Sequence, residues 1–134
     1  MNINIKNQIT GIQHIGIPTN DIDKTITFYQ GLGFEIALTT VNKAANERVA
    51  FMKMNNLIIE TYENQRAVMR AGAIDHIAMD VTDINHVYNE VKAAGYNIVH
   101  DSVQFLPFWE DGVKFFTIIG PNEEMLEFSE RLKL

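Results

Sequence analysis

Apolar and polar residues alternate in one stretch of the chain and follow a helical spacing in the next. Residues 12–19 alternate and are rich in β-branched side chains, which predicts a strand. Over residues 21–33 the apolar positions take the spacing of one helical face, with Asp21 as the candidate N-cap and Gly33 at the end. Three further strands are predicted over residues 34–41, 47–54 and 57–62.

The second half of the chain repeats this order. A strand over residues 73–81 is followed by a helix over 83–94, which Gly95 closes. Further strands are predicted over residues 97–101, 113–119 and 124–129. Each half therefore predicts one βαβββ unit.

The repeat is also visible in the residue types. Residues 12–15 (Ile-Gln-His-Ile) align with residues 74–77 (Ile-Asp-His-Ile). Further along, residues 49–51 align with residues 113–115, and Glu60 aligns with Glu127. The separation between matched positions grows along the repeat, and insertions in loops absorb the difference.

The two units predict an α+β fold. We expect a single domain over residues 9–134, made of two tandem βαβββ modules. The modules, at residues 9–64 and 73–132, are joined by a linker at 65–72. Together they are expected to form a cupped, mostly antiparallel sheet with the helices on its outer face.

Composition narrows the function classes. The chain has 134 residues, of which 46% are hydrophobic, so a core can form without staples. It has no cysteine, which excludes disulfides and thiolate metal sites and favours the cytoplasm. A net charge of −6 without a basic cluster argues against nucleic acid binding. No apolar run is long enough to suggest a membrane span.

Two histidines and two glutamates occupy equivalent positions in the two units. Because side chains alternate across a strand, His14, Glu60, His76 and Glu127 are expected opposite the apolar faces, on the cupped surface. A lone strand histidine is more often structural, but two repeat-equivalent His–Glu pairs favour a metal site. Imidazole and carboxylate ligands suit one divalent transition metal, whether Zn²⁺, Ni²⁺, Co²⁺, Fe²⁺ or Mn²⁺.

Several sequence motifs resemble those of a known protein family. These motifs are residues 13–17 (Gln-His-Ile-Gly-Ile), 21–34, 74–78 (Ile-Asp-His-Ile-Ala), 120–122 (Gly-Pro-Asn) and 126–128 (Leu-Glu-Phe). With them the chain resembles the vicinal-oxygen-chelate superfamily of glyoxalases, bleomycin resistance proteins and dioxygenases. The resemblance spans nearly the whole chain. Because position 60 is a glutamate, the chain is most similar to glyoxalase I (lactoylglutathione lyase).

The resemblance implies a reaction and its residues. In glyoxalase I a metal holds the hemithioacetal of a thiol and a 2-oxoaldehyde, which is converted to a thioester. By that similarity Glu127, or Glu60 from the mirrored side, transfers the proton beside the carbonyl. A thiol cosubstrate and a homodimer are implied as well. The alternatives are a CoA-thioester epimerase or thiol transferase on the same metal, or a non-enzymatic protein that binds a small molecule such as an antibiotic.

Candidate substrate contacts lie outside this set. The aromatic loop at residues 102–112, with Phe108 and Trp109, is expected either to cover an apolar substrate or to lie at a subunit interface. His86 and His100 lack a repeat-equivalent glutamate and are expected to be surface residues. The basic residues that could hold substrate carboxylates are Arg48, Arg66 and Lys114.

Overall fold

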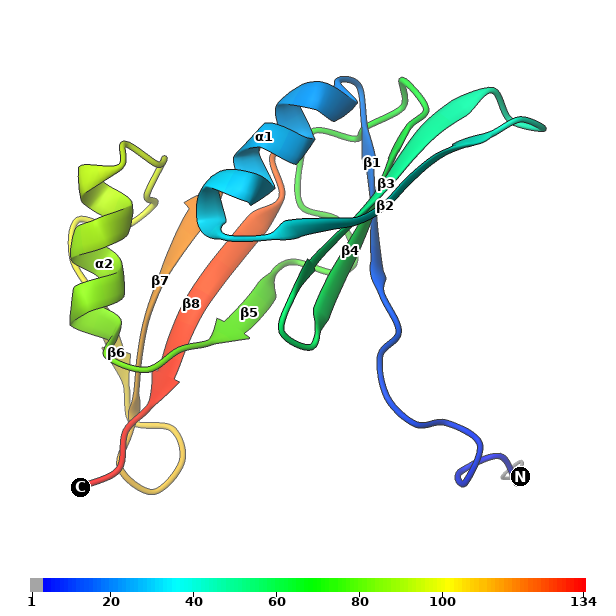
Figure 1. The fold of residues 1–134 in the computed structure, drawn as a ribbon. Helices are drawn as coiled ribbons and strands as arrows, with labels where there is room; N and C mark the ends of the chain where they lie inside the picture. Colours follow the sequence, from blue (N-terminus) through cyan, green and yellow to red (C-terminus); the bar gives the residue numbers. More distant parts are fainter. Residues whose placement is uncertain (1–3) are drawn as a thin grey trace. The chain divides into compact units, whose positions relative to one another are not determined.

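The computed structural model describes residues 4–134, in which the order βαβββ occurs twice (Figure 1). This order confirms the predicted α+β class and the two tandem modules. The chain divides into two compact units between Ala67 and Val68, named module 1 and module 2 below. Module 1 contains β1 (Ile15–Thr19), α1 (Ile22–Leu32), β2 (Glu35–Asn42), β3 (Glu47–Met54) and β4 (Leu57–Glu63). Module 2 contains β5 (Ile77–Asp80), α2 (Ile84–Ala93), β6 (Gln104–Leu106), β7 (Val113–Ile119) and β8 (Met125–Arg131).

Both modules contain a four-stranded mixed sheet with the same topology. The strand orders are β1-β4-β3-β2 and β5-β8-β7-β6. In each sheet the first strand pairs in parallel with the last, and the other pairings are antiparallel. The register agrees as well, because Gly16 lies opposite Glu60 and Ala78 lies opposite Glu127. The strands that follow the two histidines therefore pair with the glutamate-containing strands in the same register.

The predicted alignment between β3 and β7 is wrong by two positions. The sequence alignment matches Phe51 with Phe115. In the structure Phe51 lies opposite Glu60, whereas Thr117 lies opposite the equivalent Glu127. A shift of two positions leaves the inward and outward alternation of a strand unchanged. The apolar pattern could not distinguish the two alignments, whereas the hydrogen-bonded ladder does.

The predicted strand at residues 97–101 is also wrong. Within this segment only Ile98 forms a bridge, with Ile118 of β7. Regular pairing with β7 starts again at β6, inside the segment predicted to be an aromatic loop. The chain thus leaves the edge of the sheet after Ile98 and returns to it at β6, so the edge strand lies further along the chain than predicted.

Each helix covers one face of its own sheet. In module 1, Ile22 and Tyr29 of α1 are fully buried, as are Met52 and Ile59 of the sheet. In module 2, Ile84 of α2 is fully buried, as are Phe116 and Leu126. Burial of such side chains contributes roughly 1.5–3 kcal/mol each to folding, so the helical face holds the core. The opposite face of each sheet, called the open face below, carries the side chains that alternate with these core residues along the strands.

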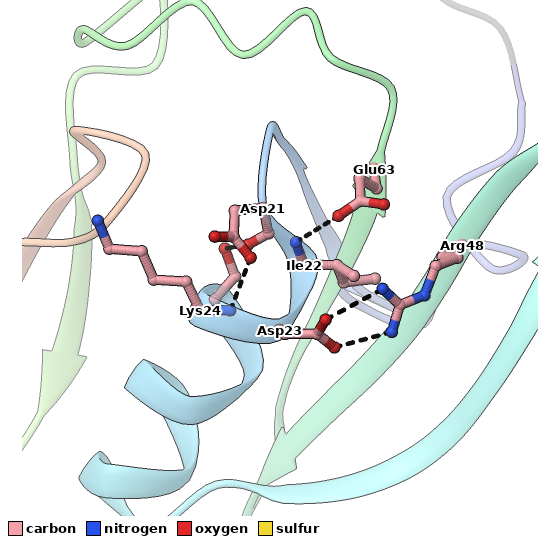
Figure 2. A network of polar contacts seen from close by, with 7 residues as sticks. Asp21, Ile22, Asp23, Lys24, Arg48 and Glu63 are labelled. Carbon is pink, nitrogen blue, oxygen red and sulfur yellow. Dashed lines mark hydrogen bonds and ion pairs between the residues drawn. The ribbon is translucent and has the colours of Figure 1, made fainter.

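The N-terminus of α1 is held by two carboxylates (Figure 2). Asp21 is the predicted N-cap, and its side chain accepts a hydrogen bond from the Lys24 N–H at 3.1 Å. Glu63, the last residue of β4, accepts a hydrogen bond from the Ile22 N–H at 2.8 Å. The first N–H groups of a helix have no partner within the helix, so these bonds satisfy donors that would otherwise be unpaired.

The equivalent glutamate does the same in module 2. Glu130 of β8 accepts hydrogen bonds from the Asp83 N–H at 3.2 Å and from the Ile84 N–H at 3.0 Å. Asp83 has a φ of 53°, a left-handed conformation that costs a non-glycine residue of order 1–3 kcal/mol. The two bonds from one carboxylate hold this residue in place at the start of α2.

None of the helices in residues 4–134 is both long enough and apolar enough to cross a lipid bilayer.

We predict that Glu63→Ala lowers the free energy of unfolding by about 1 kcal/mol, because one helix N–H loses its acceptor. Glu130→Ala should cost more, since two N–H groups and a left-handed N-cap depend on it. Urea unfolding of the two variants measures both effects. The matched controls are Glu63→Gln and Glu130→Gln, which retain a carbonyl acceptor and should lose less. Equal losses for the alanine and glutamine variants would contradict the capping role.

Candidate functional site

The open face of module 1 brings His14 and Glu60 together. His14 directly precedes β1, and Glu60 lies at the middle of β4, beside Gly16 in the parallel register. The His14 Nε2 is 3.4 Å from the Glu60 Oε1, and the two side chains are 33% and 26% exposed. Both groups can therefore be reached by solvent and by a ligand, while the strands beneath them fix their spacing.

Two aromatic residues border this pair. The ring of Phe51, which lies opposite Glu60 on β3, is edge-on to the His14 ring with centroids 5.6 Å apart. A Cβ added at Gly16 would lie 3.5 Å from Cε1 of Tyr62 and 3.8 Å from the Glu60 Oε1. Tyr62 therefore lies beside the glutamate, and the absent side chain at position 16 leaves space next to both.

The other ring nitrogen of His14 has its own partner. The His14 Nδ1 lies 3.0 Å from the side-chain oxygen of Gln13, the preceding residue. The imidazole is thus contacted on both nitrogens, by an amide on one side and a carboxylate on the other. Such an outer hydrogen bond is the usual means of orienting a histidine that binds a metal.

Module 2 has a histidine and a glutamate at the equivalent positions, with different neighbours. His76 precedes β5, and Glu127 lies on β8 at the position equivalent to Glu60. The His76 Nδ1 lies 2.9 Å from a carboxylate oxygen of Asp75. Thr117 and Ser129 occupy the positions that Phe51 and Tyr62 hold in module 1. The half-site of module 2 is therefore bordered by small hydroxyl side chains instead of aromatic rings.

Each module offers half of the predicted His₂Glu₂ set. Across residues 4–134, no three histidine, aspartate or glutamate side chains come close enough to hold a metal ion. Module 1 does bring its histidine and glutamate into contact, and module 2 has the same strand register. The predicted four-residue metal site remains a prediction.

Of the predicted basic substrate contacts, Arg48 and Lys114 lie on the helical faces, whereas Arg66 is exposed in the segment after β4. Arg48 forms a bidentate ion pair with Asp23 of α1, at 2.8 and 3.2 Å (Figure 2). Hydrogen bonds and charge from Arg48 lower the pKa of the Asp23 carboxyl group, and the pair raises the pKa of Arg48. Lys114 lies opposite Glu130, the residue that caps α2. Within their own modules, neither cation shares the open face with a histidine–glutamate position.

The aromatic side chains of the loop at residues 102–112 are exposed, and one of them lies against a cation. The ring of Trp109 is 65% exposed and lies under the guanidinium of Arg131, which is 3.9 Å from its centroid. Phe108 is exposed beside it in the chain. Their predicted role in substrate binding remains a prediction.

The two remaining histidines differ from each other. His86 is exposed on α2, as expected. His100 is half-buried, its Nδ1 is buried without a hydrogen-bond partner, and its ring is edge-on to Phe115 at 5.9 Å. The expectation that His100 is a plain surface residue is wrong, because the irregular segment after Ile98 places it against β7.

Sequence reasoning missed the residues that border and orient the two half-sites. The signal for Gln13 and Asp75 was available, since each precedes one of the two repeat-equivalent histidines. The alignment error between β3 and β7 hid the equivalence of Phe51 and Thr117. Side-chain partners such as these depend on the exact register, which the apolar pattern does not give.

Residues 11–104 match the sequence model of the Glyoxalase/Bleomycin resistance protein/Dioxygenase superfamily. A probable lactoylglutathione lyase of Vibrio parahaemolyticus is 32% identical over 98 residues, which is 68% of this chain and 71% of that protein.

Solved structures of this kind have the same fold. The glyoxalase family protein from Enterococcus faecalis superposes with a TM-score of 0.77 at 21% identity, covering 92% of this chain and 99% of that one. The fosfomycin resistance protein FosX of Listeria monocytogenes, solved with Mn(II) and sulfate, has a TM-score of 0.71 at 17% identity. That match covers 92% of this chain and 94% of the resistance protein.

Proposed function

Because the chain belongs to the glyoxalase/bleomycin resistance protein/dioxygenase superfamily, we propose that it is a metal-dependent lyase or isomerase. Its substrate would be the hemithioacetal of a small thiol and a 2-oxoaldehyde, and its product a thioester. The similarity to a probable lactoylglutathione lyase supports this choice within the superfamily. So does the glutamate at position 60, next to His14.

The distance between His14 and Glu60 carries the proposal of a metal. Two ligand atoms about 2.1 Å from one ion are about 3.0 Å apart at a right angle and about 3.4 Å apart at the tetrahedral angle. The observed distance between Nε2 and Oε1 is 3.4 Å, which suits two ligands of one ion. We propose His14, Glu60, His76 and Glu127 as the ligands of one divalent transition metal, of the kind found as Mn(II) in the fosfomycin resistance protein.

The glutamates would also move the proton. A bound metal would act as a Lewis acid toward the oxygens of the substrate and make the adjacent carbon more acidic. A carboxylate within reach, Glu127 or Glu60, takes the proton from the carbon beside the carbonyl and returns it to the neighbouring carbon. The space beside Gly16, next to Glu60 and Tyr62, supports access of a small substrate to the open face of module 1.

The remaining proposed contacts concern the substrate. The exposed aromatics Phe108 and Trp109 offer an apolar cover for a small-molecule substrate. Arg48 and Lys114 were expected to hold substrate carboxylates, but both lie on the helical faces of their modules. We therefore propose a thiol whose binding does not depend on these two cations.

A second candidate function is thiol transfer or another reaction at the same metal on an antibiotic-like molecule. The structural match to the fosfomycin resistance protein over nearly all of both chains favours it. It would use the same four ligands, so metal binding does not separate the two candidates. Turnover of a hemithioacetal does separate them.

We also propose that the protein is a homodimer. Strand β2 is an edge strand whose residues are all exposed, and it carries the exposed apolar side chains Ile36, Leu38 and Val41. An exposed apolar edge strand is commonly covered by a partner.

The metal content of the protein tests the proposed centre. Protein purified without a histidine tag should contain about one transition-metal ion per chain by mass spectrometry. His14→Ala and Glu127→Ala should both lose it, because each removes a ligand. The control is His86→Ala, which removes an exposed imidazole on α2 and should retain the metal. Wild-type protein that contains no metal and takes up no Ni²⁺, Co²⁺ or Zn²⁺ would rule out the proposed centre.

Turnover of defined thiol adducts tests the proposed reaction. Metal-loaded protein should isomerise the hemithioacetal of methylglyoxal with at least one thiol from a panel of glutathione, coenzyme A and free cysteine. Glu127→Gln or Glu60→Gln should lower kcat by roughly 10²–10⁴-fold, because an amide cannot accept the proton. The formation of the thioester, followed by its absorbance, measures this. A loaded protein that converts none of these adducts would favour the second candidate function.

Mixtures of two inactive variants test whether one chain or two chains form a site. His14→Ala and His76→Ala should each be inactive alone. Mixed after partial unfolding and refolding, they should regain up to about a quarter of the wild-type activity if each site joins two chains, because only mixed dimers carry an intact site. Light scattering of each sample reports the oligomeric state. Failure of dimeric mixtures to regain activity would show that each site closes within one chain.

A further inference from the structure

We infer that Gln13 and Asp75 are positioning residues that hold His14 and His76 in the tautomer with the proton on Nδ1. We infer further that the amide at one histidine and the carboxylate at the other make the two half-sites unequal in metal binding. This inference rests on the proposed function, in which both histidines bind one metal. Gln13 and Asp75 gain a role in that proposal, and the two histidines differ in how strongly they bind the metal.

The tautomer follows from the chemistry of the partner atoms. The contacts are between the His14 Nδ1 and the amide oxygen of Gln13, and between the His76 Nδ1 and a carboxylate oxygen of Asp75. An amide oxygen and an ionised carboxylate can only accept a hydrogen bond. At distances of 3.0 and 2.9 Å, the ring nitrogen must be the donor in both pairs. In a neutral imidazole, Nε2 then carries the lone pair.

This tautomer has a consequence on the other side of the His14 ring. Nε2 lies 3.4 Å from the Glu60 Oε1, so a neutral His14 presents a lone pair to a carboxylate. Two acceptors at this distance repel each other unless a cation lies between them. Gln13 thereby prepares the pair for a cation, because it prevents the neutral ring from donating to Glu60 from Nε2.

The same geometry occurs twice with different residue types. Gln13 and Asp75 occupy equivalent positions in the repeat, each directly before its histidine. One supplies an amide oxygen and the other a carboxylate oxygen, yet their distances to Nδ1, 3.0 and 2.9 Å, are nearly equal. What the two modules share is therefore an acceptor for Nδ1–H, whatever residue provides it.

The difference between the two acceptors makes the half-sites unequal. A hydrogen bond to a carboxylate is charge-assisted and roughly twice as strong as one to a neutral amide. It draws the proton of Nδ1 toward oxygen and makes Nε2 the stronger electron donor to a metal. His76 should then bind the metal more strongly than His14, although the two residues are equivalent in the fold.

Nitrogen NMR on the full-length, metal-free protein tests the tautomers. At about pH 8.5, where imidazole side chains are generally neutral, long-range ¹H–¹⁵N spectra distinguish protonated from unprotonated ring nitrogens. Four single histidine substitutions assign the signals. His14 and His76 should show a protonated Nδ1 and an unprotonated Nε2. Gln13→Ala and Asp75→Ala should each move only the neighbouring ring toward the mixture shown by exposed His86.

Conservative variants test the asymmetry. Asp75→Asn retains an acceptor oxygen and should restore the tautomer of His76, but it should weaken Zn²⁺ or Ni²⁺ binding about 10-fold by calorimetry. Gln13→Glu should strengthen binding, because it gives His14 the same kind of partner as His76. The matched control is Asp101→Asn, which removes one charge beside α2, where the Asp101 carbonyl accepts from Tyr88. This control should bind metal as the wild type does.

The outcomes separate this inference from the proposed function. Rings of His14 and His76 that stay unchanged in Gln13→Ala and Asp75→Ala would overturn the positioning role. Equal metal affinity for Asp75→Asn and the wild type would overturn the asymmetry. The predicted tautomers in a protein that binds no metal would instead overturn the proposed centre and leave the positioning role standing.

Discussion

The hydrogen bonds from the helix N-termini to Glu63 and Glu130 set the architecture of both modules. Each ties the start of a helix to the end of the last strand and so fixes which face of the sheet the helix covers. Glu60 lies three positions before Glu63, and Glu127 lies three before Glu130. Because an odd separation along a strand reverses the direction of the side chain, each strand uses one glutamate to hold its helix and presents the other on the open face.

Much of the fold could be predicted from the sequence because its signals are periodic. The alternation of apolar residues indicated the strands, Asp21 and Asp83 marked the helix starts, and the internal repeat indicated the module order. Two predictions were wrong for one reason. The alignment of β3 with β7 and the strand at residues 97–101 both agree with the apolar pattern of the sequence, although the structure differs from both. Only the hydrogen-bonded ladder distinguishes these possibilities.

For the candidate site, strand alternation predicts which residues share a face of the sheet and does not predict their partners. That alternation placed His14 and Glu60 on one face, and the structure brings them together. It contained no information about which long side chain meets which partner. Arg48 pairs with Asp23 on the helix, far away in sequence, and is thereby kept on the helical face. Such pairings depend on distances between elements, and no local pattern encodes them.

Because side chains point alternately to the two faces of a strand, the residues that form the core differ from those that face a ligand. A substitution at Glu127 changes the open face of β8, and it leaves in place Leu126 and Phe128, which are buried, and Glu130, which holds α2. A proposed metal ligand can therefore be replaced while the core stays apolar. In this architecture a well-folded relative need not be a metalloprotein, and thermal stability says little about whether the chemistry has been retained.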